Sequence, residues 1–169
     1  MSRALTFAFL EGFSLFHVRG LAARATVESV VADLPGTVLT ARTLPDGGFV
    51  ACLGMREYFL LTPADRPLLQ PLRCDEVTVT ARCDALIRVS GEKAGLWLRQ
   101  TSPVNLSGRP QDDFLMSRLL KVGCWLTWAA VDRMPGTGFL IGCDPTYSDY
   151  FSEALRQSLQ DFAAVRPAA

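Results

Sequence analysis

The chain has 169 residues, of which 49% are hydrophobic and 20% charged, a composition typical of a globular protein and unlike that of a disordered one. Its 17 basic and 17 acidic residues balance, and no run of lysines and arginines occurs, which argues against nucleic acid as the main partner. A mean hydropathy of +0.20 at zero net charge suggests a surface that a partner covers. No stretch approaches the ~20 apolar residues of a membrane span, and no signal-peptide cleavage site is visible, so we expect a cytoplasmic protein.

The first part of the chain reads as one strand, one helix and three further strands. Residues 13–20 end at a glycine and are predicted to form a strand. Residues 21–34 carry apolar residues at helical spacing and stop at Pro35-Gly36. The β-branched and apolar runs that follow are predicted to be strands at 37–43, 49–54 and 57–63. Residues 64–76 contain two prolines and are expected to cross the surface without a long helix.

The second part partly repeats this order. Strands are expected at 77–82, 85–91, 123–133 and 139–144, and helices at 92–100 and 147–165. Residues 102–114 are expected to form a loop, and residues 115–120 a helical turn. The order predicts an α+β fold with mainly antiparallel sheets. We expect two ferredoxin-like halves, residues 1–72 (βαβββ) and 73–169 (ββαββα), that form one compact domain.

Ser90 and Lys93 form an S-x-x-K motif where a strand passes into a helix. This pattern resembles the nucleophile and base of the penicillin-recognising enzymes, but their S-D-N and K-T-G motifs do not occur here. Ser90 is interpreted instead as the N-cap of the helix, with Lys93 on its exposed side. A hydrolase built on these two residues remains a separate hypothesis.

The other polar residues give no catalytic arrangement. His17 is the only histidine and is interpreted as a structural hydrogen-bonding residue in a strand. Asp112-Asp113 is interpreted as a solvated loop pair, and the glycines of 44–49 and 134–139 as hairpin turns. With one histidine and no close cysteine pair, a zinc site is not expected. The cysteines are expected to be free and mostly buried: Cys52, Cys74, Cys83, Cys124 and Cys143.

The three tryptophans are the candidate partner contacts: Trp97, Trp125 and Trp128. By strand parity Trp125 and Trp128 point to opposite faces. One of them therefore packs in the core, and the other needs a second layer, which is either a helix or another chain. No catalytic, cofactor-binding or metal-ligating residue is predicted.

Three stretches in this order resemble the gamma subunit of heterotetrameric sarcosine oxidase. They are "ACLGMREYFLLTP", "DALIRVSGEKAGLWLRQTSPVNL" and "GCWLTWAAVDRMPGTGFLIGCDPTYSDYFSEALRQSL". The family's strand into "SGPxAxxLL", its "xPLDL" stretch and its last helix have counterparts in the second and third stretches. The matching positions are Ser90, Gly91, Ala94, Pro103, Val104, Asn105, Leu106, Tyr150 and Leu155.

The resemblance implies a fold like the folate-binding domain of the glycine cleavage aminomethyltransferases. It also implies a non-catalytic small subunit of a complex that oxidatively demethylates a small N-methyl amine or amino acid, in sarcosine catabolism and one-carbon metabolism. Such a subunit stabilises the folate-binding domain of the large subunit. Flavin, NAD and tetrahydrofolate are then expected on larger alpha- and beta-type partner subunits, with no cofactor on this chain. The alternative is a stand-alone tetrahydrofolate-binding protein of the same fold.

Overall fold

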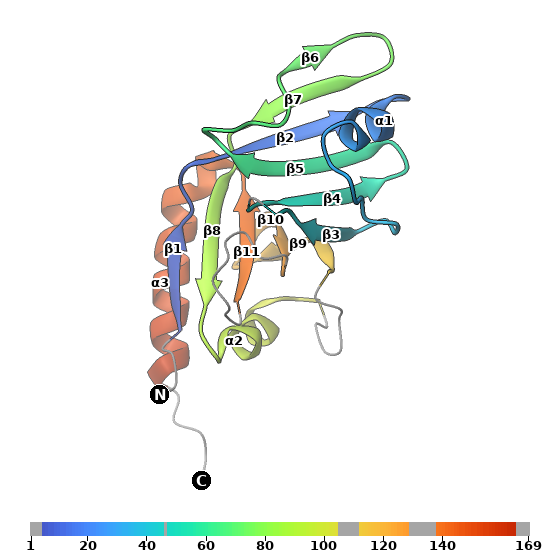
Figure 1. Cartoon of the computed structure of the whole chain (residues 1–169). Coiled ribbons are helices and arrows are strands. Elements are labelled where there is room, and N and C mark those ends of the chain that lie inside the picture. Colours follow the sequence, from blue (N-terminus) through green and yellow to red (C-terminus); the bar gives the residue numbers. More distant parts are fainter. Residues whose placement is uncertain (1–4, 46, 105–111, 129–137, 165–169) are drawn as a thin grey trace.

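The structure is a computed structural model that describes residues 5–45, 47–104, 112–128 and 138–164, and Figure 1 shows its arrangement. Within these residues the chain forms two antiparallel sheets and a few helices. The strands of the first sheet are β1 (Thr6–Phe9), β8 (Ala85–Ser90), β11 (Gly138–Cys143), β10 (Val122–Thr127) and β9 (Phe114–Leu119), in that order. The strands of the second sheet are β3 (Thr40–Thr43), β4 (Phe49–Gly54), β5 (Glu57–Pro63), β2 (Phe13–Arg19), β7 (Thr78–Arg82) and β6 (Leu72–Arg73), in that order. The helices are α1 (Ala23–Glu28), α2 (Ala94–Thr101), the 3-10 helix η1 (Pro145–Tyr147) and α3 (Ser148–Ala164).

Each sheet takes strands from both predicted halves of the chain. β1 leaves the start of the chain and pairs with β8, with Thr6 opposite Ser90. β7 follows the predicted boundary but pairs with β2, with Val18 opposite Val79. The two sheets therefore do not coincide with the predicted halves 1–72 and 73–169.

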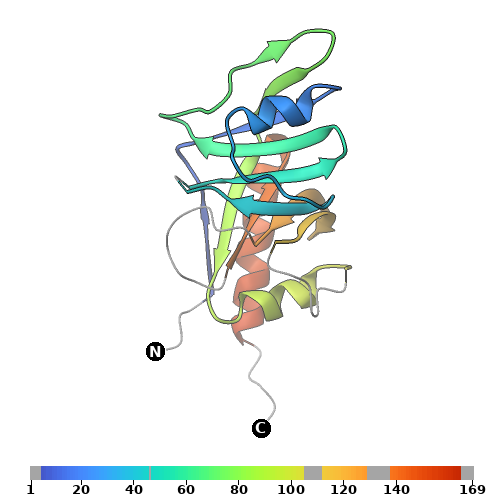
Figure 2. The same ribbon diagram turned by 45° about the vertical axis from the view of Figure 1, so that its right-hand side comes forward.

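The sheets pack face to face, with helices on their outer faces. Figures 1 and 2 show α3 running along the outer side of the first sheet, with α2 near one end of that sheet. The apolar stripe of α3 buries Phe151, Leu155 and Leu159 against the first sheet. The short helix α1 covers part of the second sheet through Ala23 and Val27. The result is the predicted α+β class with antiparallel sheets.

The layer between the sheets is rich in aromatic side chains. Phe49 and Phe59 come from the second sheet, and Phe114 and Trp125 from the first. The Phe114 ring stacks on the Trp125 indole at 5.5 Å between centroids, and Phe49 meets the same indole at 5.5 Å edge to face. Offset-stacked and edge-to-face pairs of this kind add to the hydrophobic effect of burial.

Three segments differ from the predictions. Residues 115–120 were predicted as a helical turn, but 114–119 form β9, which pairs along its length with β10. Residues 6–9 were not assigned to an element and form the edge strand β1. The helix predicted over 21–34 is wrong in length, since α1 ends at Glu28 and the chain continues without regular structure to β3.

Candidate functional site

Ser90 does not cap a helix, so that prediction is wrong. It lies at the end of β8, where its Oγ is 3.3 Å from the Thr6 Oγ1 of β1. Gly91 follows with a φ of 128°, a conformation that favours glycine, and the chain turns before α2 begins at Ala94. The position before α2 is Lys93, which makes no side-chain capping bond and is exposed, as predicted. The motif is thus the end of a strand followed by a turn.

His17 is a structural hydrogen-bonding residue, as predicted. Its Nε2 donates to Glu57 Oε1 at 2.7 Å across the β2–β5 pair, and its ring meets Phe59 edge to face. Burial lowers the pKa of His17 below 6.5, although the bond to Glu57 acts in the opposite direction. The neutral imidazole therefore holds two strands together.

Two of the three tryptophans are core residues, which corrects the expectation that they contact a partner. Trp97 is 0% exposed, and its indole N–H donates to Ser158 Oγ of α3 at 2.9 Å. Trp125 is 3% exposed in the layer between the sheets. Trp128 is half-buried on the opposite face, against Phe139, so the predicted opposite parity is confirmed. A partner contact at Trp128 stays a prediction.

The cysteines and the aspartate pair give no metal site within the described residues. Cys52, Cys124 and Cys143 are buried as expected, but Cys74 and Cys83 are exposed. Burial raises the pKa of Cys124 to about 12 and that of Cys143 to about 11, so both facing thiols stay protonated. The Asp112 side chain is exposed, and its backbone carbonyl accepts from Ala41 N–H. No group of three histidine, cysteine or acidic side chains is placed to hold a metal in this part of the chain.

Asp84 joins the two sheets, a role that the sequence did not indicate. Its side chain is only 4% exposed and accepts hydrogen bonds from Arg82 at 2.9 Å and from the Trp125 indole at 2.8 Å. Arg82 belongs to the second sheet and Trp125 to the first, and the Arg82 guanidinium also lies over the Phe59 ring. A buried carboxylate is stable only when paired in this way, so Asp84 is occupied by structural contacts.

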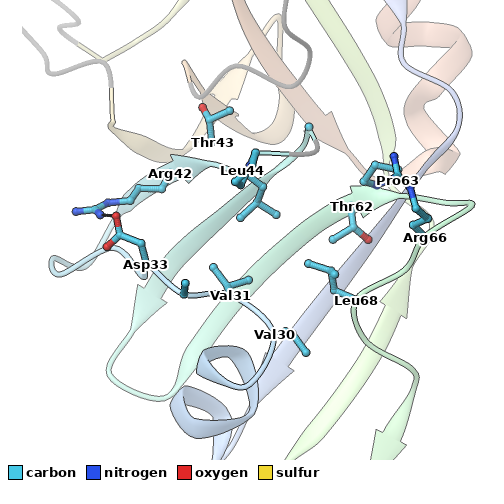
Figure 3. A pocket seen from close by; sticks show the side chains of 13 residues that line it. Val30, Val31, Asp33, Arg42, Thr43, Leu44, Thr62, Pro63, Arg66 and Leu68 are labelled. Carbon is cyan, nitrogen blue, oxygen red and sulfur yellow. Dashed lines mark hydrogen bonds and ion pairs between the residues drawn. The ribbon is translucent and has the colours of Figure 1, made fainter.

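An apolar cavity of about 510 Å³ lies at the end of the second sheet (Figure 3). Its walls come from the segment after α1, from the β3–β4 hairpin and from the crossing after β5. They include Val31, Leu44 and Leu68. Thr62 also lines the cavity and is 0% exposed, and its hydroxyl has no hydrogen-bond partner among the described residues. The sequence does contain a signal for this site. Tyr58, Leu60 and Thr62 alternate along one face of an apolar strand, so the polar Thr62 stands at a position that alternation predicts to be buried.

Other motifs lie partly outside the described residues. The "PVNL" stretch is described only as far as Val104. The predicted strand end at 129–133 and the predicted turn at 134–137 lie outside the described residues. Within the described residues, no helix is long and apolar enough to cross a membrane. The expected cytoplasmic location stays a prediction.

The fold is shared with chains of two solved enzyme structures. A solved structure of heterotetrameric sarcosine oxidase from Corynebacterium sp. U-96, in complex with pyrrole 2-carboxylate, contains a chain that matches with a TM-score of 0.78 and 18% identity. That match covers 99% of this chain and 90% of the other. The glycine cleavage system aminomethyltransferase T from Bartonella henselae matches with a TM-score of 0.69 and 14% identity, over 91% of this chain and 46% of that one.

No protein-family model matches the sequence, and no curated protein matches it. At 18% and 14% identity the likeness to solved structures establishes the fold. The predicted resemblance is therefore confirmed in three dimensions: this chain folds like a chain of a heterotetrameric sarcosine oxidase and like about half of an aminomethyltransferase.

Proposed function

We propose that this chain is a non-catalytic, gamma-like small subunit of a sarcosine-oxidase-type complex. The complex would oxidatively demethylate a small N-methyl amine or amino acid. The chain would stabilise the folate-binding domain of a larger subunit, while flavin, NAD and tetrahydrofolate would bind to the alpha- and beta-type partners.

The mutual coverage of the structural match carries this proposal. It spans 99% of this chain and 90% of a chain from a heterotetrameric enzyme, so the two chains are of similar length and share one fold from end to end. The match to the aminomethyltransferase covers only 46% of that chain, so this chain corresponds to about half of such an enzyme.

The contacts of the chemistry-bearing side chains support a structural role. His17 is bonded to Glu57, Ser90 lies against Thr6, and Asp84 is held by Arg82 and Trp125. Each of these groups serves strand pairing or sheet packing. None of the three therefore has the nucleophile and base geometry that catalysis by this chain would require.

Exposed apolar side chains supply candidate contact surfaces. Met55 is 87% exposed and Leu21 is 64% exposed. They lie at the same end of the second sheet, because Gly20 N–H donates to Arg56 carbonyl oxygen at 3.1 Å. Met116, 60% exposed, lies on the edge strand β9. Apolar groups of this size are typical of the centre of a protein interface.

Co-purification tests the proposal. The tagged chain is expressed together with the genes that neighbour its own, and the eluate is analysed by mass and by visible absorption. We expect larger chains in fixed ratio with a flavin spectrum. A single colourless chain, under conditions where the neighbours are expressed and folded, would contradict the proposal.

Surface variants locate the contact in the same experiment. Leu21→Glu combined with Met55→Glu alters one end of the second sheet, and Met116→Glu alters the β9 edge. We expect one of the two changes to release the partner, because a charge at an apolar interface is costly. Retention of the partner by both variants would contradict a contact at either surface.

Tetrahydrofolate binding by this chain itself is the alternative, which the match to the aminomethyltransferase favours. A folate site needs a carboxylate that faces the pteridine. The buried Asp84 carboxylate already accepts bonds from Arg82 and Trp125, which argues against this role. Calorimetric titration of the chain with tetrahydrofolate distinguishes the two functions, since the alternative requires saturable heat.

A further inference from the structure

The cavity at the end of the second sheet exists because helices cover only part of that sheet. α1 ends at Glu28, and its buried residues Ala23 and Val27 lie over the middle of the sheet. The crossing after β5, residues 64–71, contains two prolines and forms no helix. Where β5 ends, the face that carries Tyr58, Leu60 and Thr62 is therefore covered by loop segments and not by a helix.

The cavity combines apolar walls with one buried polar atom. The larger apolar residues of its lining are Val30, Val31, Leu44, Pro45, Pro63 and Leu68. The Thr62 hydroxyl has no hydrogen-bond partner in the described part of the chain, although the residue is 0% exposed. Figure 3 shows the Thr62 side chain leaving β5 on the side where Leu68 and Val31 lie. An unpaired buried hydroxyl is unfavourable, so a group that bonds to it would gain affinity.

The charges around the cavity favour an anion. Three of the described lining residues are charged: Asp33, Arg42 and Arg66. Arg42 and Asp33 form an ion pair with each other. Arg66 is exposed and makes no side-chain hydrogen bond or ion pair with the described residues, so its guanidinium is available to a ligand. In Figure 3 Arg66 lies beside Thr62 and Pro63.

We propose that this cavity is a binding site for a small amphipathic carboxylate. The apolar part of the ligand packs between Val31, Leu44 and Leu68. Its carboxylate accepts hydrogen bonds from Arg66 and from the Thr62 hydroxyl. Arginine suits this task because its planar guanidinium donates two parallel bonds to a carboxylate.

The size and shape of the site fit such a ligand. A volume of about 510 Å³ lies within the range of ligand pockets, and apolar walls with a few polar groups are their usual composition. Leu68 is 40% exposed on the crossing without a helix. The Thr62 hydroxyl is closed to solvent, so a ligand in the cavity bonds to it only after a neighbouring side chain of the wall has moved.

The test uses the full chain and octanoate as the probe. Acetate lacks the apolar chain, and 1-octanol lacks the charge. Calorimetry measures affinity, and methyl NMR shifts of Val31, Leu44 and Leu68 report the location. We expect octanoate to bind about tenfold more tightly than 1-octanol, with acetate undetected.

Three variants separate the contributions. Arg66→Gln removes the charge at similar length and is expected to weaken octanoate binding about tenfold. Thr62→Val keeps the shape, removes the hydroxyl, and is expected to weaken binding while leaving the unfolding midpoint equal or higher. Arg56→Gln is the matched control, since Arg56 lies in the turn at the opposite end of β5 and is exposed.

The outcomes decide the proposal without reference to the proposed function, because the chain is tested alone. Octanoate binding that Arg66→Gln weakens and Arg56→Gln leaves unchanged supports the site. No binding at millimolar octanoate, equal binding of 1-octanol, or loss of affinity in Arg56→Gln equal to that in Arg66→Gln would overturn it.

Discussion

Substitution of Gly142 tests the packing of Trp125 against the first sheet. Gly142 of β11 lies directly opposite Trp125 of β10. A Cβ built at Gly142 falls on the Trp125 indole, well inside van der Waals contact with three of its ring atoms. The ring cannot shift easily, because Phe49 and Phe114 pack around it and its N–H is bonded to Asp84. Gly142→Ala is therefore expected to displace the indole.

The expected cost has two parts. Overpacking a core costs about 1–3 kcal/mol. Breaking the indole N–H bond to the buried Asp84 carboxylate adds about 1.5–3 kcal/mol, the range for hydrogen bonds to charged groups. We expect Gly142→Ala to lower the free energy of unfolding by about 2.5–6 kcal/mol.

Urea unfolding followed by far-UV circular dichroism measures this change. Gly123→Ala is the matched control, since Gly123 lies on the neighbouring strand β10 and an added Cβ there meets nothing within 4 Å. We expect it to change stability by less than about 0.5 kcal/mol. A Gly142→Ala variant that loses less than about 1 kcal/mol would refute the reasoning, because overpacking alone should exceed that.

Three further predictions concern hydrogen bonds. His17 has a pKa below 6.5 in the folded chain, so the unfolded state binds more protons between the two pKa values. The stability that the neutral His17 contributes is complete above pH 6.5 and is lost as the pH falls. The His17→Gln variant should therefore lose less stability than the parent between about pH 7 and about pH 5. Urea titrations that give the same change of unfolding free energy with pH for both proteins would contradict this. Ser90→Ala should change stability by less than about 0.5 kcal/mol, because Ser90 caps no helix. Asp144→Ala should lower the urea midpoint more than Ser90→Ala does, because the Asp144 carboxylate accepts hydrogen bonds from the Thr146 N–H and hydroxyl at the start of η1. A larger loss in Ser90→Ala than in Asp144→Ala would refute the assignment of Asp144, and not Ser90, as a capping residue. Trp97→Phe should cost about 1–3 kcal/mol through the lost bond to Ser158, and a thermal melt unchanged from the parent would contradict it.

Local pattern was enough to predict many of the strands and the last helix. Alternation in the strand predicted at 13–20 puts Leu15 on the face opposite Phe16 and Val18. In the structure Leu15 packs between the sheets, and Phe16 and Val18 pack on the outer side. The side-chain period of a strand is 2 residues and that of a helix is about 3.6 residues. Both are properties of the segment itself, so they can be read from its sequence without knowing what it packs against. The opposite faces of Trp125 and Trp128 follow from the same parity.

Two segments whose strand character shows in their pairing were misread. In 114–119 the apolar residues Leu115 and Leu119 are four apart, as in a helix, but Phe114 packs between the sheets while Leu115 packs outside. β9 is buried on both faces at its start and exposed at Met116, so it shows no regular alternation, and its pairing with β10 identifies it as a strand. β1 is a short edge strand whose partner β8 lies far along the chain, so no local signal marks it.

The candidate site was beyond sequence reasoning for a similar reason. Thr62, Arg66, Leu44 and Val31 come from four segments that meet only in the folded chain. Asp84 was not singled out, because a carboxylate between two strands has no special sequence signature until Arg82 and Trp125 are placed around it. The two prolines of 64–76 indicated a surface crossing without a long helix, as the structure has it, but not the cavity beside it.

The exchange of strands between the sheets affects how the chain folds during synthesis. Among the described strands β1 is synthesised before the others, but its partner β8 follows only after every strand of the second sheet. The second sheet can pair as it emerges, up to β7, while β1 stays without a partner for several seconds at ordinary rates of translation. The apolar segment around Phe7 and Phe9 is thus exposed longest, and it is where we expect a chaperone to bind the nascent chain.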